Sequence, residues 1–138
     1  VSSEMCAARL NKNFVRNFSV SSTSATVSLP ARNYPSTSVI VTEAHGIVKL
    51  IESLRVSSAC GVDNINAGIL KETKHASSMF LCKIFQQSLN EGVVPRVWKE
   101  AKVIPLHKSG NEHSVTNYQP ISLTSVPCKL LEHIIFSN

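Results

Sequence analysis

Apolar residues recur every three or four positions along several stretches of the chain, a spacing that predicts amphipathic helices. Thr42, Asn66 and Ser125 are suited to cap helix starts, because their side-chain oxygens accept hydrogen bonds from free backbone N–H groups. Gly92 is the expected stop of the longest helix. The predicted helices span residues 4–18, 42–55, a short segment after Asn66, 76–90 and a last segment after Ser125.

The helix predicted over residues 76–90 carries a wide apolar stripe. We expect five of its side chains to face the core: Phe80, Leu81, Ile84, Phe85 and Leu89. The stripes of the other helices consist of Met5, Leu10, Phe14 and Phe18, then Ile47, Leu50, Ile51 and Leu54, then Ile69 and Leu70, and finally Leu130, Leu131, Ile134 and Ile135. These helices should supply most of the hydrophobic core.

Two segments in the second half of the chain, 101–108 and 118–123, alternate in polarity and are rich in β-forming residues. They predict an antiparallel hairpin around a polar loop. Pro105 indicates an edge strand or a bulge, because proline donates no hydrogen bond to a sheet. We expect the large apolar residues of this region to be buried, namely Trp98, Val103, Ile104 and Leu106. The predicted fold class is α+β, mainly helical with a small antiparallel β-hairpin.

A polar stretch separates the first predicted helix from the rest. Seven of the ten residues from Ser19 to Ser28 are Ser or Thr, and Pro30 and Pro35 follow. Such a composition is typical of a linker, with an edge strand as the alternative. We therefore expect residues 1–41 to form a tether with a short helix and a Ser/Thr-rich linker, and residues 42–138 to form the compact part.

Composition narrows the class of protein. Of the 138 residues, 43% are hydrophobic and 17% are charged, which excludes a wholly disordered chain. No apolar run approaches the roughly 20 residues that a membrane helix needs. The net charge of +5 favours polyanions without specificity. The chain starts at Val1 without a secretory signal, so we expect a fragment that resides in the nucleus or cytoplasm and is not secreted.

Simple site motifs are absent from the sequence. A calcium loop starting at Asp63 would have Ile65 at a ligand position and Lys74 in place of its glutamate. Asp63 is the only aspartate, so the chain lacks the carboxylates of a two-metal site. The spacing of the four cysteines fits no zinc site, and we expect reduced thiols at Cys6, Cys60, Cys82 and Cys128.

An ordered series of motifs over residues 57–132 is far more specific. It contains Gly61-Val62-Asp63-Asn64-Ile65, Ile69-Leu70-Lys71, the segment from Trp98 to Gly110, Asn117-Tyr118-Gln119-Pro120-Ile121-Ser122-Leu123, and Lys129-Leu130-Leu131-Glu132. The series closely resembles the start of the reverse-transcriptase domain of non-LTR (LINE-type, jockey-like) retrotransposons. There the pattern reads G-x-D-x-I, then W-x-x-A-x-V-x-P-x-x-K-x-G, then N-Y-R-P-I-S-L. The resemblance covers about residues 42–138.

The resemblance implies the N-terminal fingers portion of an RNA-directed DNA polymerase, whose hairpin closes over the incoming nucleotide. Lys108 matches the lysine expected to face the nucleotide phosphates. Gln119 stands where the family has arginine, so a charge-assisted phosphate contact is lost there. The palm, with its catalytic aspartates, lies beyond Asn138, so no catalytic or metal-binding residue is expected in this chain.

The resemblance also implies partners: the RNA template and DNA of the parent element, dNTPs and Mg²⁺ in the complete enzyme, and the missing palm domain. No membrane partner is expected. For Gly61 and Asp63 we weigh a structural turn against a template contact. For Lys99 and Lys102 the alternatives are solvent exposure and a template contact.

Three functions stay open at this point. The first is a polymerase fragment that is inactive alone. The second is a small basic nucleic-acid-binding module without catalysis. The third is a product without function that is unstable because its apolar faces lack the palm.

Overall fold

The computed structural model describes residues 2–16 and 39–138. The predicted linker, including Phe18, lies outside these residues. The described chain forms two compact units: residues 104–121 group with the N-terminal segment, and residues 38–103 group with residues 122–138. The division of the chain at residues 41 and 42 stays a prediction.

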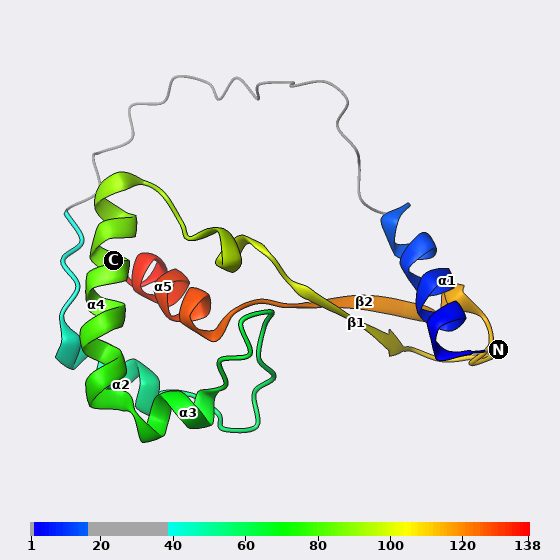
Figure 1. The fold of residues 1–138 in the computed structure, drawn as a ribbon, viewed down its shortest axis with the longest axis horizontal. Coiled ribbons are helices and arrows are strands. Elements are labelled where there is room, and N and C mark those ends of the chain that lie inside the picture. The colour runs from blue at the N-terminus through cyan, green and yellow to red at the C-terminus, as the bar shows by residue number, and fades with distance from the viewer. Residues whose placement is uncertain (1, 17–38) are drawn as a thin grey trace. The chain divides into compact units, whose positions relative to one another are not determined.

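The first unit combines a helix with residues 104–121, which form most of a hairpin (Figure 1). Helix α1 (Ser3–Val15) begins at Ser2, whose hydroxyl accepts a hydrogen bond from the Met5 N–H at 3.3 Å. Strands β1 (Lys102–His107) and β2 (Tyr118–Leu123) form a two-stranded sheet, and a short 3₁₀ helix, η2 (Val115–Asn117), leads into β2. The predicted helix is confirmed over residues 4–15, and both predicted strands are confirmed.

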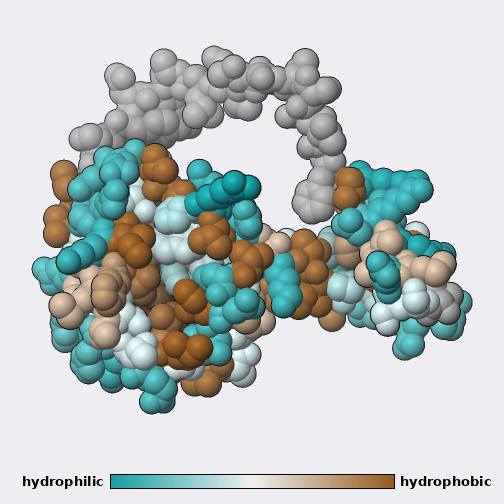
Figure 2. All heavy atoms as spheres, in the orientation of Figure 1, coloured by the Kyte–Doolittle hydropathy of each residue, from teal (hydrophilic) through white to brown (hydrophobic). Residues whose placement is uncertain are grey.

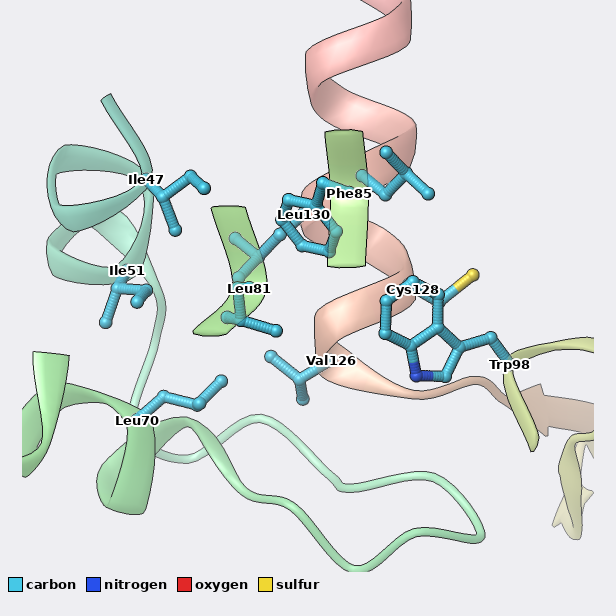
Figure 3. Packing of buried hydrophobic residues seen from close by; sticks show 10 residues of the cluster. Ile47, Ile51, Leu70, Leu81, Phe85, Trp98, Val126, Cys128 and Leu130 are labelled. Carbon is cyan, nitrogen blue, oxygen red and sulfur yellow. The ribbon is translucent and has the colours of Figure 1, made fainter. Parts of the chain in front are cut away.

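The second unit is helical and holds the main core. Its elements are α2 (Ala44–Ser53), α3 (Ala67–Glu72), α4 (Lys74–Glu91), the 3₁₀ helix η1 (Arg96–Lys99) and α5 (Val126–Phe136). Figure 3 shows side chains from α2, α3, α4 and α5 that point toward one another. The cluster consists of Ile47, Ile51, Leu70, Leu81, Phe85, Trp98, Val126, Cys128, Leu130 and Leu131.

Local sequence explains how these helices begin and end. The Asn66 side chain accepts a hydrogen bond from the Ile69 N–H at 2.8 Å, so the predicted cap of α3 is confirmed. Gly92 ends α4 with φ of +65°, a left-handed conformation that costs glycine little. Trp98 is buried in η1 and meets Phe85 edge-on, with ring centroids 5.7 Å apart. The core prediction for Trp98 is therefore confirmed.

Two capping predictions were wrong in detail. Helix α2 begins after Glu43, and Thr42 instead binds α4: its N–H and hydroxyl both donate to Gln86 Oε1. Ser125 does stand at the start of α5, but its hydroxyl makes no capping bond to that helix. Both side chains serve contacts with distant parts of the chain, which local sequence does not reveal.

Several residues expected in the core are exposed. On α4, Phe80 is 69% exposed and Ile84 is 39% exposed, whereas Leu81 and Phe85 are buried. On the hairpin, the exposed residues are Val103 (42%), Ile104 (42%) and Leu106 (50%). Met5, Ile69 and Ile135 of the predicted stripes are exposed as well. Figure 2 shows apolar surface both on helices and on the hairpin strands.

None of the helices in the described residues is both long enough and apolar enough to cross a membrane.

Candidate functional site

The register of the hairpin decides which of its side chains share a face. The Lys108 N–H donates to the Asn117 carbonyl at 2.9 Å, and the rings of His107 and Tyr118 are 5.1 Å apart. Lys108 is therefore opposite Asn117, and His107 is opposite Tyr118. Along the whole antiparallel ladder, the numbers of two directly opposed residues add up to 225. Side chains of directly opposed residues lie on the same face, and the faces alternate along each strand.

This register places Pro105 directly opposite Pro120. Residues 104 and 106 then occupy the hydrogen-bonded positions, so the two prolines fall where the N–H would point away from the partner strand. Neither proline therefore removes a bond from the ladder. The prediction that Pro105 marks an edge is explained, because both strands of a two-stranded sheet are edges.

Lys108 and Gln119 share one face of the hairpin. Gln119 pairs with Leu106, and Lys108 follows two residues later on the same side of β1. Both side chains are exposed, as are the neighbouring Ile104 and Ile121. This face is therefore an open apolar strip that carries one exposed cation and one exposed amide.

Asn117, for which no separate role was predicted, holds the loop after Lys108. Asn117 Nδ2 donates to the Asn111 carbonyl at 3.0 Å. Gly110 has φ of +83°, and a Cβ there would lie 2.8 Å from Asn117 Nδ2. The loop thus depends on the absence of a side chain at position 110. The only sequence signal for Asn117 was its place in the Asn117-Tyr118-Gln119-Pro120 motif.

Gly61 and Asp63 form a turn that is attached to the start of α5. The Asn64 N–H donates to the Gly61 carbonyl at 3.3 Å, and Asn64 has a positive φ of 56°. Asp63 Oδ1 accepts from the Ile65 N–H at 3.2 Å, and Asp63 Oδ2 accepts from the Ser125 hydroxyl at 2.5 Å. The structural turn weighed from the sequence is observed.

Gly61 allows this attachment by lacking a side chain. The residue is buried, and a Cβ there would lie 2.6 Å from the Ser125 nitrogen and 2.7 Å from the Thr124 carbonyl carbon. Ser125 itself is completely buried. We call Gly61, Asp63 and Ser125 the clasp. Sequence analysis placed Ser125 at a helix start but missed its bond to Asp63, 62 residues away in the chain.

Lys99 and Lys102 lie in the same unit as Gly61 and Asp63, at the end of η1 and the start of β1. Both lysines are exposed. The intervening Glu100 pairs instead with Arg96, at 3.4 Å between Nε and Oε1. Solvent exposure of both lysines is observed, and their contact with a template stays a prediction. Lys108 and Gln119 belong to the other unit.

The described residues do not fit a magnesium site. No group of three His, Cys, Asp or Glu side chains comes together in residues 2–16 and 39–138. Asp63, the only aspartate, already accepts hydrogen bonds from Ile65 and Ser125. The four cysteines are free thiols. The described residues present exposed cations, amides and apolar groups.

Curated proteins similar to this chain include two transposon enzymes of Drosophila melanogaster. The probable RNA-directed DNA polymerase from transposon BS is 36% identical over 90 residues, which are 64% of this chain and 10% of that protein. The RNA-directed DNA polymerase from mobile element jockey is 30% identical over 93 residues, which are 67% of this chain and 10% of that protein. No protein-family model matches the chain.

The chain therefore spans about a tenth of the length of these relatives. They confirm the resemblance to jockey-like non-LTR retrotransposon proteins that the motifs indicated.

Proposed function

We propose that this chain, a homologue of transposon-encoded RNA-directed DNA polymerases, is a fragment of such an enzyme and supplies part of its fingers. The relatives carry this proposal, since they share 36% and 30% of aligned residues with the chain. In the complete enzyme, the hairpin would close over the incoming dNTP while RNA template and DNA occupy the rest of the site. Such an enzyme would act in the nucleus or cytoplasm.

Lys108 is the proposed phosphate-binding residue. Its side chain is exposed, and its backbone is held by the bond to Asn117. A lysine ammonium neutralises part of the triphosphate charge that develops during phosphoryl transfer. Gln119 lies on the same face and offers a neutral amide, which binds phosphate more weakly than the family arginine would.

The chain alone is expected to have no polymerase activity, because its described residues do not fit the two-metal site of nucleotidyl transfer. The test is a primer-extension assay on the purified chain with an RNA template, dNTPs and Mg²⁺. We expect no incorporation above that of a heat-denatured sample. Template-dependent extension would refute the proposed inactivity.

The phosphate contact is tested in a chimeric polymerase in which this chain replaces the matching segment of the jockey enzyme. Lys108→Ala should raise the KM for dNTP about tenfold or more, because a hydrogen bond to a charged group contributes roughly 1.5–3 kcal/mol. Gln119→Arg should lower the KM by restoring a bidentate cation. Lys49→Ala, an exposed change on α2, is the control and should leave the KM unchanged. If Lys108→Ala behaves like this control, the hairpin does not touch phosphate.

A second candidate function is a basic nucleic-acid-binding module without catalysis, favoured by the exposed Lys99 and Lys102 and the net charge of +5. If Z cations contact the phosphates of duplex DNA, log K should fall with log[salt] with a slope of about −0.9Z. Lys99→Ala with Lys102→Ala should reduce that slope by about two, measured by fluorescence anisotropy. Binding no tighter than that of a neutral protein at low salt excludes this candidate.

A further inference from the structure

Helix α1 and the hairpin belong to one compact unit, although about 90 residues separate them in the chain. Near the end of α1, Asn13 Nδ2 donates to the Val115 carbonyl at 3.2 Å. The next residue, Phe14, is only 5% exposed. Helix α1 lies in the segment predicted to be a tether, and this hydrogen bond joins it to the hairpin loop, which lies beside the helix in Figure 1.

Helix α1 lies at the loop end of the hairpin, on the side of Tyr118. Cys6, Arg9 and Leu10 of α1 line a cavity of about 510 Å³ together with Tyr118 and the loop residues Glu112, His113 and Val115. Tyr118 lies on the face opposite to Lys108 and Gln119, as the register requires. On this face the ring nitrogen Nε2 of His107 is shielded from solvent, and Tyr118 donates its hydroxyl hydrogen to the Glu112 carbonyl at 3.0 Å.

The opposite face remains open. Leu106 is 50% exposed, Ile104 is 42% exposed and Ile121 is 37% exposed, and Lys108 and Gln119 are exposed among them. Near the loop, packing against α1 therefore distinguishes the two faces of this two-stranded sheet, whereas Val103, farther along the face of Tyr118, is 42% exposed.

We propose that α1 is a supporting helix of the hairpin, and that Asn13 and Phe14 are positioning residues that hold the hairpin loop so that Lys108 stays at the open face. A two-stranded hairpin by itself is marginally stable in water and needs packing on one face. Phe14 supplies buried apolar area, and Asn13 pins the carbonyl of Val115, two residues before Asn117. Only the role of Lys108 rests on the proposed function, whereas the support of the hairpin by α1 does not.

Hydrogen exchange on the full chain tests this support. Phe14→Ala should speed exchange of the hairpin amides in residues 104–121 tenfold or more, while the amides of α4 keep their protection. Asn13→Ala should have the same effect on the loop to a smaller degree. Met5→Ala is the matched control, because Met5 lies on the same helix but is 58% exposed, and it should leave hairpin exchange unchanged.

A second variant keeps the test decisive if Phe14→Ala unfolds α1. Phe14→Leu retains an apolar side chain and should restore most of the hairpin protection. If α1 loses its protection in Phe14→Ala while the hairpin exchanges as in the wild-type chain, α1 does not support the hairpin. Hydrogen exchange tests whether α1 supports the hairpin, and the KM of Lys108→Ala for dNTP tests whether Lys108 contacts phosphate. Each of these two proposals can therefore fail without the other.

Discussion

The thiol of Cys128 shows how burial acts on a single residue. Cys128 is 8% exposed at the start of α5, and its Sγ donates to Glu132 Oε1 at 3.5 Å. Burial raises the pKa of this thiol from about 9 to about 11, and the hydrogen bond and negative charge of Glu132 act in the same direction. The folded protein therefore keeps this proton at pH values where the unfolded chain loses it.

The pKa shift predicts a loss of stability in alkali. Between pH 9 and about 11 the unfolded state binds fewer protons than the folded state, so the free energy of unfolding falls as pH rises. Below pH 9 the contribution is fully present. Cys128→Ala should show a shallower fall over this range in urea titrations followed by the fluorescence of Trp98, the only tryptophan. Cys6→Ala, at an exposed site, is the control, and equal slopes for both variants would contradict the assignment.

At the scale of elements, the clasp joins the loop before α3 to the start of α5. Gly61→Ala should lower the free energy of unfolding by about 1–3 kcal/mol, because the added Cβ meets the backbone of Ser125 at 2.6 Å. Gly46→Ala is the matched change, since its Cβ would have nothing within 4 Å and alanine favours a helix. It should stabilise the protein by roughly 0.5–1 kcal/mol. Urea denaturation of both variants measures the difference, and similar losses in both would refute the close approach.

The elements themselves were largely predictable from local sequence, because the apolar period and the turn residues act over a few positions. Asn66 and Gly92 were assigned correctly for this reason. Thr42 was assigned wrongly, because its partners Cys82 and Gln86 lie 40 and 44 residues away. Ser125 was likewise placed at a helix start while its bond to Asp63 was missed. The local sequence pattern locates a helix, but it does not reveal which distant groups form hydrogen bonds with the polar side chains at the start of that helix.

The candidate site was predictable only as a set of motif positions. Sequence located Lys108 and Gln119 near the hairpin, but the shared face follows from the register, and a ten-residue loop between the strands leaves the register open. The role of Gly110 was equally hidden, because it depends on the approach of Asn117. These features are tertiary, and only the folded arrangement reveals them.

At the scale of the whole molecule, the chain has more apolar surface than it buries in its core. The periodicity of α4 predicted five inward side chains, yet Phe80 and Ile84 face outward together with Met79, which is 63% exposed. The apolar stripe of α4 is wide, and only the side that carries Leu81 and Phe85 packs into the core. Since the aligned residues make up only 10% of each relative, a protein of that length has further parts that can cover this surface.

This exposed face of α4 predicts self-association of the chain at high concentration, because contiguous apolar patches on a monomer favour contact with other copies. Phe80→Glu should reduce the apparent mass measured by light scattering at concentrations where the wild-type chain associates. Asn11→Glu is the control, as it adds the same charge at an exposed polar position of α1 and leaves the apolar face of α4 unchanged. If both variants reduce association equally, added charge explains the effect and the Phe80 surface does not. If neither does, the contact between copies lies elsewhere on the molecule.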